Sequence, residues 1–170
     1  GDFDIKITAP ANHIVVCSGE LLNEAEVLTA TQFSRMQQAK KSNNTVMIRT
    51  AAELNDPASR PKAATLTWHF QLNNARDVAW ASSKSFIWDA AKINLPGGKT
   101  ALAMSVYPQE SDGKKGWGRS TEYTKASIEN YSRRWFVYPY PAAVNVATNI
   151  GGMEYPGIVF CGFRATESDL

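Results

Sequence analysis

The sequence contains little cysteine, little histidine and almost no excess of charge of either sign. Its 170 residues include two cysteines, Cys17 and Cys161, and two histidines, His13 and His69. Cysteines this few and this far apart exclude a disulfide framework and a cysteine-built zinc site, and two histidines leave little material for metal binding or acid–base catalysis. The 18 Lys and Arg residues barely outnumber the 16 Asp and Glu residues, so nucleic acid is not an expected partner.

Long apolar runs are missing as well. No stretch approaches the roughly 18–20 apolar residues that a membrane-spanning helix needs, so no membrane span is expected. The chain begins Gly1-Asp2-Phe3-Asp4, without an initiator methionine or a signal peptide. We therefore expect the natural protein to start elsewhere, and these residues predict neither a cellular location nor an oligomeric state.

What is present is the composition of a globular protein, with 44% hydrophobic and 20% charged residues. Apolar and polar residues alternate strictly over 2–8 and 65–70, which is typical of half-buried strands. Further strands are predicted at 13–17, at 46–48 and within 78–93.

One hairpin and one helix complete this first half of the chain. The turn-forming residues Pro10 and Asn12 separate the first two predicted strands, and we expect residues 10–12 to join these strands as a hairpin. An irregular helical stretch is predicted over about 24–41, with a helix between about 29 and 41. Thr29 and Gln32 form a T-x-x-Q capping box that satisfies free amides at its start. Its apolar face is thin, which predicts a position on the surface.

The pattern changes at Pro96-Gly97-Gly98. Behind this break, Ile128, Tyr131 and Trp135 fall on one stripe of a predicted helix at spacings of three and four. The predicted elements there are a strand at 101–107, a helix at 120–136, and strands at 142–150 and 158–161. We therefore predict a domain boundary near Pro96–Lys99, with a mostly β domain before it and α/β character after it.

The most unusual segment for chemistry is the predicted turn between the last two strands. Gly151 and Gly152 allow a backbone to approach a ligand closely, and Glu154 is a single carboxylate in the same turn. A carboxylate in this position can receive a cationic group such as an amine. The local pattern is also that of a tight β connection with a solvated glutamate, and both interpretations stay open at this point.

The remaining candidates point to structure rather than catalysis. His13 and His69 lie within strand patterns, and neither has a Glu or a second His at a metal-ligand spacing. Cys17 and Cys161 are flanked by apolar residues, which predicts buried thiols. No Ser/His/Asp set, phosphate loop or paired-carboxylate site is found, so no catalytic residue and no metal ligand is predicted in this chain.

Several ordered segments carry a resemblance to a known family. Gly151-Gly152-Met153-Glu154 matches the exopeptidase motif Gly-x-Met-Glu-Asn, with Tyr155 where Asn is usual. A predicted helix, the turn Tyr138-Pro139-Tyr140-Pro141 and a strand precede it in the same order as in the family. The chain thereby resembles the aminopeptidase N-like zinc metallopeptidases, the gluzincin family that includes leukotriene hydrolase. The resemblance is strongest at 76–88 and 131–162, and residues 24–62 look like an insertion.

The resemblance implies an α+β fold in two parts. Residues 1–98 would be the latter part of a β-sandwich or saddle-shaped N-terminal domain. Residues 99–170 would be the first β/α part of a thermolysin-like peptidase domain. The family holds its zinc with a His-Glu-x-x-His motif and a downstream Glu, and no histidine follows His69 here. The resemblance therefore implies zinc in a full-length parent protein and none in this chain, with the sequence ending at Leu170 before the zinc helix.

The implied function is that of a zinc aminopeptidase fragment, which removes N-terminal residues from peptides only as part of the parent. By resemblance, Glu154 binds the α-amine of a peptide substrate, and Gly151, Gly152 and Met153 align the peptide backbone. Tyr155 in place of Asn affects the fine geometry of this site. The alternative function is a non-catalytic β-rich binding module that keeps the peptidase scaffold, and 170 residues alone are expected to be inactive.

Overall fold

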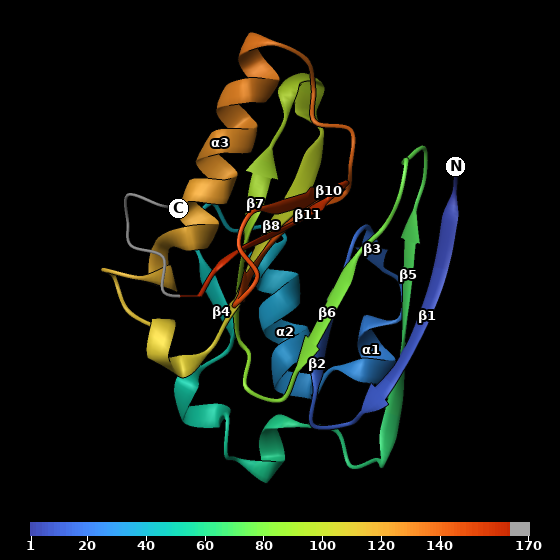
Figure 1. Cartoon of the computed structure of the whole chain (residues 1–170), viewed down its shortest axis with the longest axis vertical. Coiled ribbons are helices and arrows are strands. Elements are labelled where there is room, and N and C mark those ends of the chain that lie inside the picture. Colours follow the sequence, from blue (N-terminus) through green and yellow to red (C-terminus); the bar gives the residue numbers. More distant parts are fainter. Residues whose placement is uncertain (164–170) are drawn as a thin grey trace.

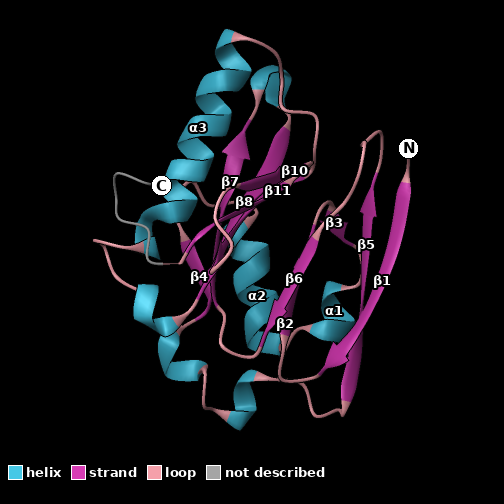
Figure 2. Ribbon diagram, in the orientation of Figure 1, coloured by secondary structure: helices cyan, strands magenta, loops and turns pink. Residues whose placement is uncertain are grey.

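The computed structural model describes residues 1–163, in which sheets and helices are mixed as expected of an α+β fold (Figure 1, Figure 2). The strands are β1 (Phe3–Pro10), β2 (Ile14–Cys17), β3 (Glu20–Leu21), β4 (Val46–Arg49), β5 (Thr65–Leu72), β6 (Trp80–Ser83), β7 (Ile87–Asn94), β8 (Thr100–Tyr107), β9 (Ala142–Thr148), β10 (Met153–Tyr155) and β11 (Ile158–Gly162). The α-helices are α1 (Glu24–Val27), α2 (Ala30–Ala39) and α3 (Ser120–Arg134). None of the helices in this range is long and apolar enough to cross a membrane.

The first strands form two small antiparallel sheets. β1 pairs with β5 in a register that runs from Phe3 opposite Leu72 to Pro10 opposite Thr65, and β3 pairs with the other edge of β5. β2 pairs instead with β6 in a separate two-stranded sheet. The predicted hairpin between the first two strands is therefore wrong. The chain does turn after Pro10, but alternation shows which face of a strand is buried and not which strand it pairs with.

A six-stranded mixed sheet forms the centre of the molecule, in the order β10-β11-β9-β8-β7-β4. β8 and β9 are parallel and are connected through α3, and β9 and β11 are also parallel. The predicted boundary at 96–99 falls in the turn between β7 and β8, which are adjacent antiparallel strands of this sheet. Strands from both sides of the predicted boundary share this sheet. The division into two domains stays a prediction.

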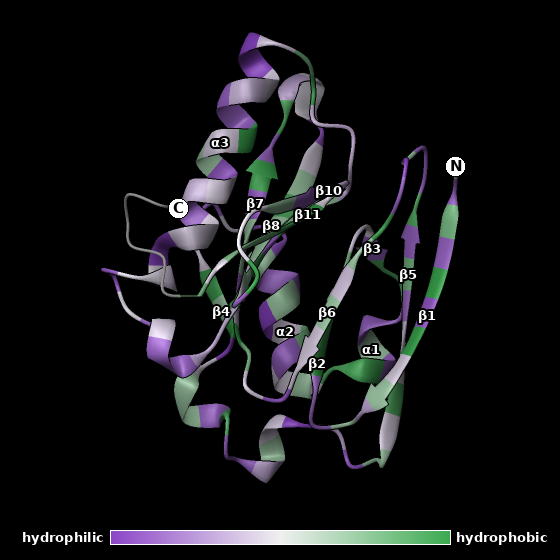
Figure 3. Cartoon of the chain, viewed as in Figure 1, coloured by the Kyte–Doolittle hydropathy of each residue, from purple (hydrophilic) through white to green (hydrophobic). Residues whose placement is uncertain are grey.

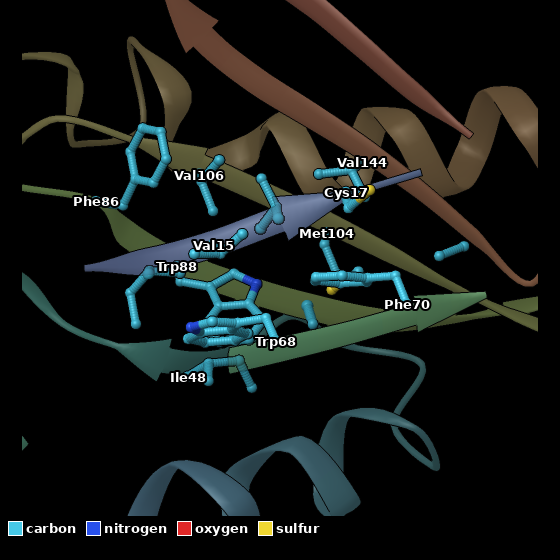
Figure 4. Packing of buried hydrophobic residues seen from close by; sticks show 14 of the residues in the cluster. Val15, Cys17, Ile48, Trp68, Phe70, Phe86, Trp88, Met104, Val106 and Val144 are labelled. Carbon is cyan, nitrogen blue, oxygen red and sulfur yellow. The ribbon is translucent and has the colours of Figure 1, made fainter. Parts of the chain in front are cut away.

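The main core lies between the six-stranded sheet and the N-terminal strands. Trp68 from β5 and Trp88 from β7 lie close to each other in this core, with Val15 and Met104 nearby (Figure 4). Both tryptophan side chains are at most 2% exposed. Burial of large side chains on this scale supplies most of the free energy that opposes unfolding.

Helix α2 closes this core from the side of β4 and β7. The predicted capping box is confirmed: Thr29 Oγ1 accepts a hydrogen bond from the Gln32 amide at 3.2 Å, and Gln32 Oε1 accepts one from the Thr29 amide at 3.1 Å. The predicted surface position is only partly right. Met36 and Ala39 are almost completely buried, because a thin apolar stripe suffices when it faces a sheet.

Helix α3 covers the opposite face of the six-stranded sheet and confirms the predicted helix (Figure 1). Its surface is largely hydrophilic (Figure 3). Ile128 packs partly against the sheet, but Tyr131 is 61% exposed and Trp135 78% exposed. The buried residues of α3 are small and polar, and the aromatic part of the predicted stripe lies on the surface.

A buried polar network joins the start of α3 to the sheet. Asp89 on β7 is 1% exposed and accepts hydrogen bonds from the Tyr107 hydroxyl at 2.7 Å and the Thr121 hydroxyl at 2.5 Å. Thr121 Oγ1 also lies 2.8 Å from Ser105 Oγ. These bonds satisfy a carboxyl group that burial would otherwise penalise strongly.

Candidate functional site

The segment expected as one long turn contains a strand. After β9 the chain crosses over β11, runs back as β10 and returns through Pro156-Gly157 as β11, so β10 is the outer edge of the six-stranded sheet. Gly157 has a φ of +76°, which suits the second central position of a turn that starts with proline. The predicted turn over 151–157 is thus corrected to a two-residue turn with a short edge strand before it.

The backbone amide and carbonyl of Glu154 point away from the neighbouring strand β11. The Gly152 amide donates to the Phe160 carbonyl at 3.1 Å, so Phe160 directs its backbone groups toward β10. Successive residues of a strand alternate in this direction, and Val159 therefore directs its own groups toward β9. Glu154 stands opposite Val159 in the register, so its amide and carbonyl point outward along the open edge.

The Glu154 side chain is exposed on the side of the sheet that carries α3. Alternation puts it on the same face as Val159 and Cys161. Burial raises the pKa of the half-buried Cys161 thiol, and the charge of Glu154 raises it further. Within the described range no hydrogen bond or ion pair occupies the Glu154 carboxylate, which is therefore free to receive a ligand.

The tyrosine that replaces the usual asparagine points the other way. Tyr155 packs edge-on against Phe160, with ring centroids 5.9 Å apart, and joins the rim of the main core. Because adjacent side chains of a strand lie on opposite faces, the Tyr155 ring does not fill the space around the Glu154 carboxylate. Met153 is 43% exposed beside it, and Gly151 and Gly152 are exposed at the start of the strand.

A cavity of about 320 Å³ lies next to this edge, between α3 and the β10–β11 hairpin. Thr124 and Ser127 line it from α3, Val159 and Cys161 line it from β11, and Asn145 lines it from β9. The Asn145 side chain is 5% exposed, and its Oδ1 atom has no hydrogen-bond partner. Asn145 is not among the site residues predicted from the sequence, because the sequence does not show whether a polar residue inside an apolar strand faces a cavity.

The described residues do not fit a zinc site. His13 Nδ1 lies 2.8 Å from Ser82 Oγ, and His69 Nε2 lies 2.9 Å from Asp4 Oδ2 in a different sheet. Cys17 is buried in the main core. Across residues 1–163, no group of three or more His, Cys, Asp or Glu side chains is placed to hold a metal ion.

Comparison with known proteins finds a similar fold but no similar sequence. No family model and no curated protein matches the chain. A two-domain M1 zinc metallopeptidase bound to L-tryptophan matches 96% of this chain with a TM-score of 0.57 and 12% identity. An M1 zinc metallopeptidase from Deinococcus radiodurans bound to a Tyr-Ser-Ala substrate matches 95% with a TM-score of 0.54 and 12% identity. A two-domain M1 zinc metallopeptidase bound to L-arginine matches 92% with a TM-score of 0.54 and 12% identity.

The match covers only a part of those proteins. The chain spans 29–30% of the length of the three solved structures. The fold of this chain is therefore similar to that of a portion of M1 zinc metallopeptidases.

Proposed function

We propose that this chain supplies the substrate-amine side of the active site of a zinc aminopeptidase. The observation that carries the proposal is the position of Gly151-Gly152-Met153-Glu154 on the open edge of a sheet, in a chain with the fold of a portion of M1 zinc metallopeptidases. One of these structures holds a peptide substrate and two hold an amino acid. The ligand expected here is accordingly the amino-terminal end of a peptide.

The edge strand offers a peptide both backbone and charge. A peptide laid beside β10 as an added strand would bond the outward amide and carbonyl of Glu154, which is a recurrent mode of peptide recognition. The Glu154 carboxylate would pair with the α-ammonium group, and Gly151, Gly152 and Met153 would line the peptide backbone. The cavity beside Asn145 would receive the first side chain of the peptide.

No hydrolytic step is assigned to this chain. Zinc belongs to the proposal only as the cofactor of the parent protein, because the histidines and cysteines of residues 1–163 do not form a donor set. The role proposed for this chain is binding and orientation, in which a carboxylate at a fixed place selects peptides with a free amino terminus. The 170 residues alone are expected to leave aminoacyl reporter substrates uncleaved.

The test is a kinetic comparison of the full-length parent protein with its Glu154→Gln variant. A hydrogen bond to a charged group contributes about 1.5–3 kcal/mol. The variant is therefore expected to lose roughly 10- to 150-fold in kcat/KM on a reporter with a free amine. An N-acetylated reporter has no ammonium group, so it should be a poor substrate for both proteins and hardly distinguish them.

Two controls accompany this measurement. Zinc content should be unchanged, since Glu154 is not proposed as a ligand, and Glu20→Gln, which removes another exposed carboxylate, should leave kcat/KM unaltered. Equal kcat/KM of wild type and Glu154→Gln on the free-amine reporter would show that Glu154 is a solvated residue of an edge strand. A parent protein without peptidase activity would favour the binding-module alternative.

A further inference from the structure

A second cavity lies at one end of the six-stranded sheet, where β4 and β8 end and β7 begins. It measures about 410 Å³ and is bounded by the end of β4, by the turns that follow it and by the turn between β6 and β7. The turns after β4 are drawn in teal at the bottom of Figure 1. Arg49, Arg60 and Lys84 line this cavity together with the amide side chains of Asn12 and Asn55. Among the described residues of the lining, Glu110 is the single carboxylate, so this part of the cavity carries an excess of positive charge.

Arg49 is the unusual member of this set, because its side chain is buried. It is 2% exposed, and its Nη1 atom donates to the Lys84 carbonyl at 3.0 Å and the Phe86 carbonyl at 3.4 Å. Its Nη2 atom donates to the Leu54 carbonyl at 3.4 Å. The Nε atom is buried and has no hydrogen-bond partner. All of these acceptors are neutral.

No carboxylate forms a hydrogen bond or an ion pair with this guanidinium within the part of the chain that the structure describes. Glu53 acts on Arg49 electrostatically, but it is engaged with Arg35 at 2.9 Å and with the Thr50 amide at 2.8 Å. Burial lowers the pKa of Arg49, Glu53 raises it and the nearby Arg60 lowers it again. A buried charge that no carboxylate contacts directly is costly, and a second cation at the same cavity increases the cost.

We propose that this cavity is a binding site for the phosphate group of a small molecule, with Arg49 at its base and Arg60 and Lys84 at its mouth. Three cations against one carboxylate leave two positive charges, which match a phosphate dianion better than a single carboxylate. Guanidinium groups present planar donor pairs that suit phosphate oxygens, and Lys84 adds a point charge. The volume exceeds that of a phosphate group alone, so a small phosphate ester fits this chemistry as well as free phosphate.

This site is independent of the proposed peptide-binding edge. β4 and β10 are the two opposite edge strands of the six-stranded sheet. Glu154 and its neighbours contribute nothing to the lining of the second cavity. Failure of either proposal therefore leaves the other intact.

The test is a titration of the 170-residue protein with inorganic phosphate and, separately, with glycerol 3-phosphate, by calorimetry and by thermal unfolding. Sodium chloride and sodium acetate at matched ionic strength are the reference titrations, because surface charge effects are screened by salt. We expect saturable heat and a rise in Tm with at least one phosphate compound and with neither reference salt. Tighter binding of the ester would identify an organic phosphate as the ligand, and equal binding would identify free phosphate.

The variants Arg60→Gln and Lys84→Gln test the position of the site. Both side chains are exposed, so their removal should leave the fold intact. Each is expected to raise the Kd about 10-fold, which corresponds to about 1.4 kcal/mol. Arg133→Gln is the matched control, because it removes an exposed arginine at the end of α3, away from the cavity lining.

Three results would overturn the proposal. They are the absence of saturable binding of either phosphate compound, equal binding of acetate, and a Kd that Arg60→Gln and Lys84→Gln leave at the wild-type value. Arg49→Lys adds a further measurement if it folds, as judged by circular dichroism. It keeps the charge and loses the planar donor pair, and it should weaken phosphate binding without abolishing it.

Discussion

Asp89 should make the stability of this protein fall as the pH rises through neutrality. Its carboxyl group is 1% exposed, and burial raises its pKa from 3.8 to about 7 although hydrogen bonds from Thr121 and Tyr107 act in the opposite direction. In the unfolded chain the group returns to its ordinary pKa. The folded state therefore holds the Asp89 proton more tightly than the unfolded state does. The contribution of this proton to the unfolding free energy is complete below about pH 4 and is lost as the pH rises through about 7.

The size of this effect follows from the two pKa values. The difference between 3.8 and about 7 corresponds to roughly 4 kcal/mol of unfolding free energy, at about 1.36 kcal/mol for each pH unit. Most of it, about 2.5 kcal/mol, is lost between about pH 5 and about pH 8, where the unfolded carboxyl is ionised and the folded one changes state. Asp89→Asn keeps an oxygen that can accept a hydrogen bond in the network and has no proton to lose.

The assay is urea denaturation at a series of pH values, followed by tryptophan fluorescence and treated as a two-state transition. From about pH 5 to about pH 8, the unfolding free energy of Asp89→Asn relative to wild type should shift by about 2.5 kcal/mol in favour of the variant. Glu20→Gln, which removes an exposed carboxyl, should leave the wild-type pH dependence in place. Parallel pH profiles for wild type and Asp89→Asn would refute the reasoning.

Two further predictions concern local structure. Thr29→Ala removes the side-chain acceptor of the capping box of α2 and should cost about 1 kcal/mol in urea denaturation, whereas Thr29→Ser should cost little; equal losses would mean that the cap does not stabilise the helix. Gly157→Ala puts a Cβ 3.2 Å from the Ala142 carbonyl oxygen at a φ of +76°, and Gly97→Ala has a similar φ of +74° with open space. Gly157→Ala should lower Tm more than Gly97→Ala, by the equivalent of about 1 kcal/mol; equal losses would show that crowding at the hairpin turn is unimportant.

The elements of the fold could be predicted from the sequence where their signals are local. Strict alternation around Trp68 predicts β5, and the Thr29–Gln32 pair predicts the start of α2. Both signals are local, because strand faces and helix caps depend on residues close together in the chain. The helix α3 was found in the same way. The stripe pattern does not show that only Ile128 reaches the sheet, while Tyr131 and Trp135 lie on the surface.

Pairing and burial could not be predicted because they depend on distant residues. Nothing near Pro10 indicates that β1 pairs with β5 rather than with β2. The candidate edge at Glu154 was found from a motif, but the strand β10 was not, because three residues are too few to show alternation. Asp89 and Arg49 read as ordinary polar residues of strands, and only the packing of α3 and of the turns after β4 buries them.

The pairing of β1 with β5 has a consequence for the newly made chain. The Thr8 and Thr67 hydroxyls, 2.9 Å apart in the folded protein, are separated by 59 residues in sequence. During synthesis β1 therefore leaves the ribosome well before its partner exists, with Ile5 and Ile7 on one face and both edges open. Such a strand is a template for pairing with other chains, and contacts of long sequence separation form slowly. A chain interrupted before residue 65 would leave both edges of β1 unpaired, whereas β5 covers one of them in the complete chain. Truncated products of this protein should therefore aggregate more readily than the complete chain.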